Sequence, residues 1–309
     1  MKIKKCPCCN GKNLNVLYTN MYDKDYSKEG NFSIIKCFDC KLEMTYPLLS
    51  EEKLKKYYPE NYYSFYDYNK LAMIYHKISA YYYSRKNPII NFFLYPFSPL
   101  FYTYYLDEGK NILEIGCGNG MKLKIYKKYG MKTFGLEPYL PKIEEKEQKL
   151  GIIKSTIKNA PYNEEMFDYI ILKEVLEHIP NQEEVLEKSY KWLKKGGKLI
   201  LTVPNTDGLW KKVFKKNWYG YDIPRHSFLH NPKNISCFLE KSGFKIDKIR
   251  IYEMPYMLDG SLKYYMADKR GKNENSLIFS NLMKVVIAPI SLILSIFKLG
   301  SMMEVHCSK

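Results

Sequence analysis

A short apolar run that breaks into three alternate glycines constrains this chain more than any other feature. Residues Asn111 to Gly120 are Asn-Ile-Leu-Glu-Ile-Gly-Cys-Gly-Asn-Gly, and a helical pattern follows from Lys122 to Tyr129. A strand that turns through glycines into a helix lets the backbone approach a ligand closely and points free N–H groups at it. A dinucleotide-binding turn would have glycine at the sixth position counted from Gly116, but that residue is Met121. The spacing therefore disfavours a nicotinamide-dinucleotide site.

Further strand and helix patterns follow in regular alternation. A second short strand is expected at residues 132–136, directly before Glu137, and a buried strand at 167–172, before the segment Val-Leu-Glu-His-Ile at 175–179. A helix through Trp192 and Leu193 is expected to end at a break over residues 194–197, and a strand over 198–203 should follow. Alternating strands and helices predict an α/β fold with a mostly parallel sheet.

The ordered set of motifs resembles one enzyme family. The pattern Glu114-x-Gly116-x-Gly118-x-Gly120, with Glu137 and the Leu-Glu-His segment after it, is similar to class I S-adenosylmethionine-dependent methyltransferases over roughly residues 107 to 250. The resemblance implies a Rossmann-like, seven-stranded mixed sheet with helices on both faces. It also implies that Glu137 accepts hydrogen bonds from both ribose hydroxyls. The cofactor-binding residues that it implies are Glu114, Gly116, Cys117, Gly118, Gly120, Glu137, Pro138, Ile157, Lys173 and His178.

The adenine end of the expected site departs from this family. Many relatives carry an acidic residue about eleven positions before the Phe-Asp pair at 167–168, whereas this chain has Thr156 there, beside Ile157. We therefore expect the backbone or Asn159 to hold the adenine amino group.

Two pairs of cysteines near the start predict a metal site. Cys6 and Cys9 form one C-x-x-C pair, and Cys37 and Cys40 form the other. Four thiolates predict one tetrahedral zinc with a structural role, since no coordination position stays open for chemistry. Cys8 is a competing ligand, and four unliganded thiols are the alternative. Certain sugar-modifying methyltransferases carry a similar N-terminal zinc-binding module, and this chain resembles them.

Residues that select the methyl acceptor are expected outside the cofactor motifs. The segment 218–228 follows the strand end at Pro204, where ligands lie in open α/β sheets. Its Pro-Arg-His triplet resembles methyltransferases of surface glycans and small metabolites. We expect His226 to act as general base, with loop anchoring as its alternative role, and Arg225 to bind a substrate phosphate. Tyr221 completes the predicted catalytic set.

Long apolar and aromatic segments lie outside the cofactor domain. Residues 277–299 form the longest apolar stretch, but Lys284 and Lys298 leave too short a run between them to span a bilayer. Helical spacing puts the polar and small residues on one narrow stripe, which predicts a helix lying against a bilayer, a dimer partner or the protein's own core. The predicted divisions are a zinc-ribbon-like module at 1–50, an aromatic-rich helical segment at 51–106, the cofactor domain at 107–252, an insertion at 253–302 and a final sheet strand at 303–309.

Charge and composition set limits on partners. Lys and Arg exceed Asp and Glu by 49 to 33, a net charge of +16 that favours anionic partners. The first residues contain no apolar stretch typical of a signal peptide, so we expect a cytoplasmic protein, peripheral on the inner face of the membrane if 277–299 binds lipid.

Three functional hypotheses follow from the sequence. The favoured one is methyl transfer to a sugar, nucleotide-sugar or lipid-linked glycan intermediate. A zinc-ribbon RNA methyltransferase is the alternative, although we find no Asn-Pro-Pro-Tyr-type motif and therefore disfavour nucleic acid. A catalytically silent, cofactor-binding scaffold is the third. The sequence leaves open the acceptor atom and the oligomeric state.

Overall fold

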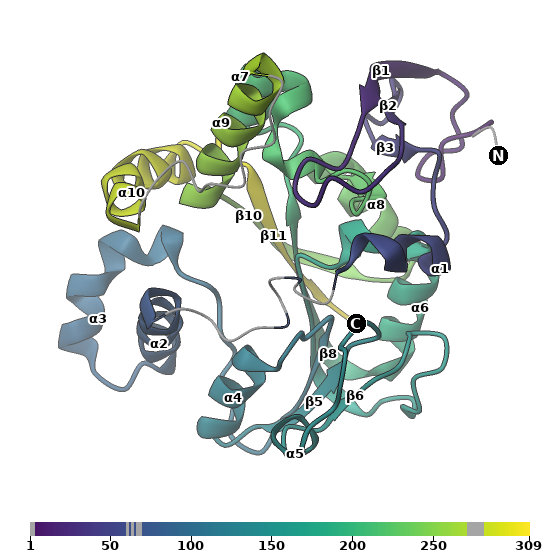
Figure 1. Cartoon of the computed structure of the whole chain (residues 1–309). Coiled ribbons are helices and arrows are strands. Elements are labelled where there is room, and N and C mark those ends of the chain that lie inside the picture. The colour runs from purple at the N-terminus through teal and green to yellow at the C-terminus, as the bar shows by residue number, and fades with distance from the viewer. Residues whose placement is uncertain (1–3, 60–61, 63–64, 66–69, 271–280) are drawn as a thin grey trace.

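A seven-stranded mixed β-sheet forms the centre of the molecule (Figure 1). The structure is a computed structural model that describes residues 4–59, 62, 65, 70–270 and 281–309. The strand order is β10-β11-β8-β7-β4-β5-β6, and β11 runs antiparallel to its two neighbours. The predicted methyltransferase-like α/β fold is confirmed. The strands are β4 Asn111–Ile115, β5 Lys132–Leu136, β6 Ile152–Ile153, β7 Phe167–Lys173, β8 Leu193–Pro204, β10 Lys245–Tyr252 and β11 Met302–Ser308.

Both faces of this sheet are buried because its central strands are apolar at consecutive positions. On β7, Ile170 and Leu172 pack in one core cluster with residues of α6 (Gln182–Trp192) and α8 (Pro232–Lys241). Ile171 points to the other face, where it joins residues of α4 (Met121–Lys128). Alternating side-chain direction along a strand explains how one apolar run supplies two cores.

The expected break at residues 194–197 lies inside a strand. β8 begins at Leu193, directly after α6, and continues to Pro204. Leu193 is paired with Phe167 and Lys198 with Tyr169, so four residues of β8 bulge out opposite one residue of β7. Gly196, with φ +73°, turns the chain in this bulge. The two glycines therefore shape a bulge in place of the predicted strand boundary.

A second sheet joins the N-terminal segment to the middle of the chain. It contains β1 Leu14–Met21, β2 Phe32–Cys37, β3 Glu43–Tyr46 and β9 Phe228–Leu229, in that order. β9 immediately follows the Pro-Arg-His triplet. Thr45 of β3 donates from its hydroxyl to the backbone oxygen of His226 over 2.6 Å and from its backbone to that of Ser227 over 3.0 Å. The small sheet therefore holds the segment that carries His226.

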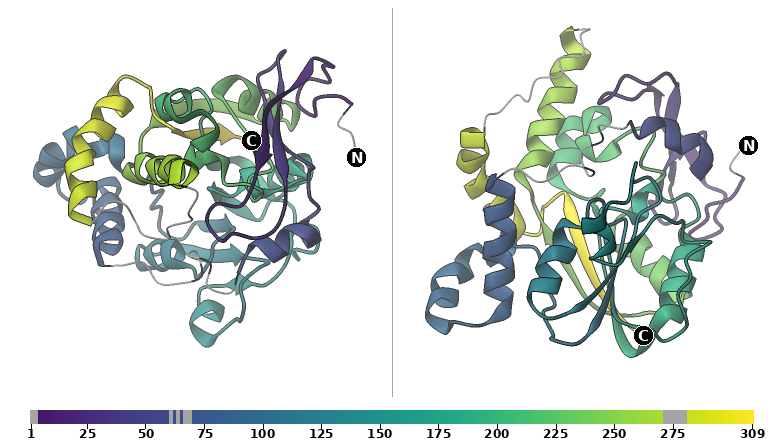
Figure 2. Two further views of the ribbon diagram at one scale, coloured as in Figure 1. Left: turned by 45° about the horizontal axis from the view of Figure 1, so that its top comes forward. Right: turned by 60° about the horizontal axis from the view of Figure 1, so that its bottom comes forward.

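A group of helices lies to one side of the seven-stranded sheet (Figures 1 and 2). The side chain of Asn87 caps the start of α3. Pro88 suits the first turn, because the backbone N–H that proline lacks would have no helical partner there. α10 packs against η3, β10 and α9. These elements are α2 Lys70–Ser84, α3 Pro88–Leu94, η3 Tyr95–Leu100, α9 Pro255–Arg270 and α10 Asn281–Ile296.

The remaining helical elements are short connections around the two sheets. No helix among the described residues is long and apolar enough to cross a bilayer. The first part of the predicted apolar helix, residues 277–280, lies outside the described residues. The short elements are α1 Glu51–Leu54, η1 Lys55–Tyr57, α5 Glu145–Gln148, η4 Leu176–His178, α7 Leu209–Phe214, η5 Lys215–Asn217 and η6 Tyr219–Tyr221.

Candidate active site

A cavity of about 620 Å³ opens beyond the carboxyl ends of β4, β5 and β7. This is the edge at which open α/β sheets bind ligands, and the volume is typical of small-molecule sites. The cavity joins the glycine turn, the end of β5 and the segment around His226 in one space. Its walls include Gly116, Cys117, Gly118, Glu137, Pro138, Thr156, Ile157, Lys173, Glu174, Glu177, His178, Tyr219, Asp222, Arg225, His226 and Tyr256.

The glycine turn and Glu137 form one end of the cavity. Gly116 and Gly118 have φ values of +68° and +53°, and a Cβ on Gly116 would lie 2.4 Å from the Val175 side chain. The backbone N–H of Gly118 donates to Glu137 Oε2 over 3.0 Å, and the N–H of Tyr139 donates to Oε1 over 3.1 Å. Burial raises the pKa of Glu137, and these two hydrogen bonds oppose that shift. A bare backbone turn beside a held carboxylate fits an adenosyl ligand.

Two predicted cofactor residues are not among those lining the cavity. Glu114 is buried on β4, and its carboxylate forms an ion pair with Lys122 over 3.1 Å. Gly120 is the left-handed N-cap of α4, where a Cβ would lie 2.5 Å from Ile152. Glu114 therefore holds the lysine that lines the wall, and Gly120 permits close packing. Both lie beside the turn but outside the cavity wall, and their part in cofactor binding stays a prediction.

Lys173 and His178 line the cavity, as predicted for the cofactor side, but both are tied to protein groups. Lys173 forms an ion pair with Glu304 of β11 over 3.5 Å and lies over the Tyr102 ring. Nδ1 of His178 is 2.9 Å from the Tyr58 hydroxyl. Burial, together with nearby His226, lowers the pKa of His178 to about 3, so its ring is neutral near pH 7. These residues shape the wall between donor and acceptor.

His226 also lines the cavity, and its ring has a defined orientation. Nδ1 is 2.7 Å from the Gly220 carbonyl oxygen, which can only accept, so Nδ1 carries the proton. Nε2 then keeps its lone pair and lies 3.7 Å from Asp222 Oδ2. Burial lowers the pKa of His226, and Asp222 opposes this shift. A neutral imidazole can take a proton, and a neighbouring carboxylate stabilises the imidazolium that results.

Arg225 lines the cavity, but protein groups occupy its guanidinium, which disfavours its predicted role in phosphate binding. Its side chain is buried, with Nη2 3.0 Å from Asp23 Oδ1 and Nε 3.0 Å from Asp222 Oδ1. Nη1 donates to the Tyr57 carbonyl oxygen over 3.3 Å. Arg225 holds the pKa of Asp222 below its usual value, although burial alone would raise it. Arg225 therefore positions Asp222, the carboxylate beside His226.

Tyr221 points away from the cavity, which contradicts its predicted catalytic role. The side chain is buried in a core cluster with Trp218 and Leu229, and its hydroxyl donates to Glu43 Oε2 over 2.8 Å. Tyr219, two residues earlier, lines the cavity instead. The tight turn of η6 sends neighbouring tyrosines in different directions, which the sequence alone did not indicate.

Glu177 was not predicted, and it adds a third group beside the two histidines. Glu177, His178 and His226 bring one ligand-type atom each within 4.8 Å of one another. Neither carboxylate oxygen of Glu177 has a hydrogen-bond partner among the described residues. Burial raises the pKa of Glu177 well above its usual value, which favours the neutral form. All three side chains line the cavity. The Leu-Glu-His motif contained this signal.

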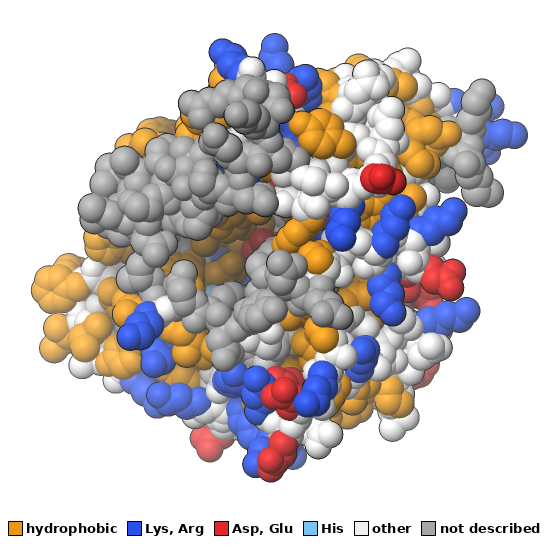
Figure 3. Space-filling model, viewed as in Figure 1, with side chains coloured by type: hydrophobic (Ala, Val, Ile, Leu, Met, Phe, Trp, Pro, Cys, Tyr) orange, Lys and Arg blue, Asp and Glu red, His pale blue; other side chains and the backbone are white. Residues whose placement is uncertain are grey.

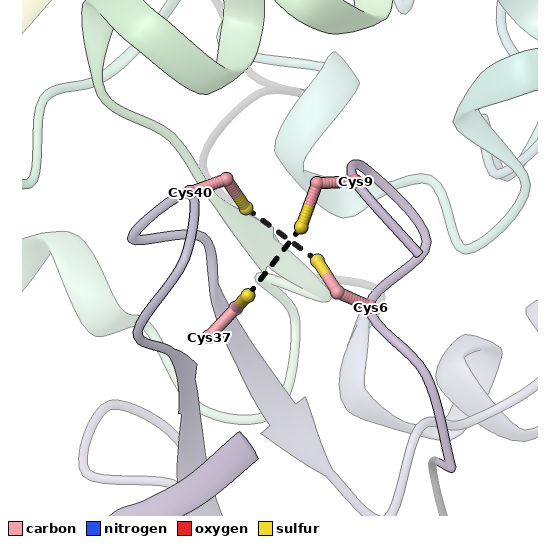
Figure 4. Close-up of side chains that lie close together, drawn as sticks. All are labelled: Cys6, Cys9, Cys37 and Cys40. Carbon is pink, nitrogen blue, oxygen red and sulfur yellow. Dashed lines mark hydrogen bonds between the residues drawn. The ribbon is translucent and has the colours of Figure 1, made fainter. Parts of the chain in front are cut away.

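The four predicted metal-binding cysteines converge away from this cavity (Figure 4). The sulfur of Cys6 is 3.5 Å from that of Cys40, and the sulfur of Cys9 is 3.6 Å from that of Cys37. Zinc–thiolate bonds of about 2.3 Å in a tetrahedron put sulfurs about 3.8 Å apart, so the arrangement is compatible with zinc. Cys8 turns away, with its sulfur 3.7 Å from the Asn234 carbonyl oxygen of α8.

Comparison with known proteins agrees with this geometry. Residues 90–249 match the family model described as a methyltransferase domain, which is more than half of the chain. The chain belongs to this methyltransferase family. The expected class I S-adenosylmethionine-dependent methyltransferase relationship is thereby confirmed, and S-adenosylmethionine is the cofactor that the glycine turn and Glu137 would hold.

Individual relatives are more distant. A mitochondrial ubiquinone biosynthesis O-methyltransferase of Rattus norvegicus is 26% identical over 160 residues, 46% of either chain. Phosphoethanolamine N-methyltransferase 2 of Caenorhabditis elegans is 30% identical over 146 residues, 44% of this chain and 32% of its own. The chain thus spans less than half the length of these relatives. A solved methyltransferase structure from Archaeoglobus fulgidus is 19% identical, with 78% of this chain and all of that chain covered and a TM-score of 0.43.

Proposed function

We propose that the protein methylates a hydroxyl group of a small-molecule acceptor with S-adenosylmethionine as donor. One observation carries this proposal: Glu137 and His226 line the same cavity, one at a cofactor-type turn and the other with its Nε2 lone pair available. Aromatic side chains form much of the cavity wall, and they bear on the choice of acceptor. Tyr58, Tyr62, Phe65, Tyr102, Tyr139, Tyr219 and Tyr256 all contribute.

The chemistry needs little covalent participation by the protein. The bound cofactor supplies an electrophilic methyl group on a sulfonium. The cavity walls align the acceptor oxygen with that group and exclude water. Nε2 of His226 takes the hydroxyl proton as the oxygen–methyl bond forms and the sulfur–methyl bond breaks, which leaves S-adenosylhomocysteine and the methyl ether. Asp222 stabilises the imidazolium, and Arg225 holds Asp222 in place.

We also propose a class of acceptor. Aromatic walls bind flat rings and the apolar faces of sugars, so a sugar, nucleotide-sugar or lipid-linked acceptor is compatible with the aromatic residues of the cavity wall. We also propose that the four-cysteine cluster holds a structural zinc, because its sulfur spacing suits a tetrahedral site. RNA is the second candidate, favoured only by the net charge of +16.

A labelled-cofactor experiment distinguishes these acceptors. The purified protein is incubated with S-adenosylmethionine carrying an isotopically labelled methyl group and with separate lipid, nucleotide-sugar and RNA extracts. Label in a lipid or nucleotide-sugar product, absent with the His226→Ala variant, supports the proposal. Salt-sensitive label in RNA would replace it with the alternative. Retained cofactor binding without label in any extract would instead indicate a catalytically silent scaffold.

A further inference from the structure

Much of the exposed apolar surface gathers on one side of the molecule. Large side chains on α3, on η3 and at the end of α10 face solvent, and Phe92, Phe93 and Ile89 are 74%, 69% and 70% exposed. α10 packs against η3, and η3 continues from α3, so the helices form one layer (Figures 1 and 2). Figure 3 shows hydrophobic side chains over the α3 edge. We call this surface the apolar face: Ile89, Phe92, Phe93, Tyr95, Phe97, Ile290, Ile293, Ile296 and Phe297.

α10 leaves part of its apolar surface exposed, although it also buries Ile287 and Leu294 against the protein. Its polar serines face inward: Ser295 Oγ accepts from the backbone N–H of Glu253 over 2.9 Å and donates to the Ser291 carbonyl oxygen over 2.7 Å. Ile290 and Ile293 face outward and are 44% and 54% exposed. Amphipathic helices normally bury their apolar side against the protein. Here Ile290 and Ile293 remain exposed and available to another partner.

The charge around the apolar face has a single sign. Neither residues 70–106 nor residues 277–303 contain any Asp or Glu. Lys77, Arg85, Lys86 and Lys298 are exposed in these segments. Long basic side chains beside aromatic rings suit the boundary between anionic headgroups and acyl chains. A second copy of the chain would bring the same positive charges against each other, which disfavours self-association through this face.

We propose that the apolar face docks on an anionic lipid bilayer, with α3, η3 and α10 lying in its surface. The sequence predicted a surface helix at 277–299 alone. The proposed docking face also includes α3 and η3, from a distant part of the chain. α9, which packs against α10, contributes Tyr256 and Met257 to the cavity wall, and Tyr102 follows η3 closely in the chain. Docking therefore holds one wall of the cavity close to the lipid. This proposal goes beyond methyl transfer and does not depend on it.

Sedimentation with vesicles tests the docking on the full chain. The probes are vesicles of phosphatidylcholine mixed with phosphatidylglycerol, and vesicles of phosphatidylcholine alone. We expect the protein to bind the anionic vesicles at least about tenfold more tightly. A Phe92→Ser, Phe93→Ser, Ile293→Ser variant should lose at least about tenfold in that affinity, because three exposed apolar anchors are removed. The matched control is Val16→Ser, Val213→Ser, which changes exposed apolar residues elsewhere.

The outcomes separate lipid binding from folding and self-association. Circular dichroism and thermal melting should give the same folded state for wild type, triple variant and control, since all five side chains are exposed. Equal vesicle binding by wild type and triple variant, or no binding by either, would overturn the proposal. So would light scattering that shows a wild-type dimer and a monomeric triple variant, because the face would then be an interface between copies.

Discussion

The backbone N–H of Gly118 donates a 3.0 Å hydrogen bond to Oε2 of Glu137. This bond joins the glycine turn after β4 to the carboxylate at the end of β5, two features 19 residues apart in the sequence. It fixes one oxygen of the carboxylate against the turn and leaves the group on the cavity wall. The donor half of the site is therefore preorganised by the protein itself, before any ligand binds.

Loss of the general base should lower turnover without loss of cofactor binding. In His226→Ala we expect kcat to fall about 100-fold or more, since a positioned base contributes about 10²–10⁴-fold. Calorimetric affinity for S-adenosylhomocysteine should change by less than about threefold, because we assign His226 to the acceptor and the cofactor to the glycine turn and Glu137. Added imidazole should restore part of the rate. Unchanged turnover would leave His226 as a loop anchor.

The pH dependence of kcat/KM should reflect the same histidine. Burial lowers the pKa of His226 from its ordinary value near 6.5, with Asp222 opposing the shift. The neutral base is present above the folded-state pKa, so the rate should stay level from pH 8 to about 6.5 and decline only below the ordinary value. A decline that begins above pH 7 in the wild type would contradict this assignment.

Arg225 should matter for stability as much as for activity. Arg225→Met leaves the buried Asp23 carboxylate and the partly buried Asp222 carboxylate without their partner, which costs about 3–5 kcal/mol for a broken buried ion pair. Urea unfolding should show this loss for the protein without substrate. A variant of normal stability with a selective rise in KM for a phosphorylated acceptor would instead support the original phosphate-binding prediction.

Zinc analysis should separate the four clustered cysteines from Cys8. We expect one zinc per chain in the purified protein, lost in Cys37→Ser and retained in Cys8→Ser, because the Cys8 sulfur turns toward α8. Loss of zinc should also lower turnover, since β3 of the cysteine-bearing sheet holds the His226 backbone through Thr45. If the zinc-free protein kept its full stability, the zinc would have no structural role.

Tyr221 offers a further test of the corrected site. Tyr221→Phe removes the hydrogen bond to buried Glu43, which should cost about 1.5–3 kcal/mol of unfolding free energy. Its kcat and KM measured well below the melting temperature should match those of the wild type, because Tyr221 faces away from the cavity. A tenfold loss of kcat in a stable Tyr221→Phe protein would restore its predicted catalytic role.

Local patterns were sufficient to predict the central part of the fold. The strands at 111–115, 132–136 and 167–173 and the turn between Gly116 and Gly118 depend on neighbouring residues, so periodicity and glycine spacing identified them. The convergence of four cysteines followed from paired spacing. The fold of this region is thus encoded within short segments.

Roles that depend on distant partners could not be predicted. Arg225 is held by Asp23, 202 residues away, and Tyr221 by Glu43, 178 residues away. Periodicity also found the polar stripe of α10 without indicating that Ser291 and Ser295 would face inward. Which side of a helix is buried depends on what lies beside it, and that information comes only from the folded chain.

Calorimetry on a Glu137 variant shows whether this cavity binds S-adenosylmethionine. Isothermal titration calorimetry of S-adenosylhomocysteine should give one site per chain in the wild type. Glu137→Ala should weaken it at least about tenfold, because hydrogen bonds to a charged group contribute about 1.5–3 kcal/mol each, while Glu164→Ala, an exposed carboxylate outside the cavity wall, should bind as the wild type does. Absence of binding to the wild type, or equal affinity in Glu137→Ala, would contradict the assignment of this cavity to S-adenosylmethionine.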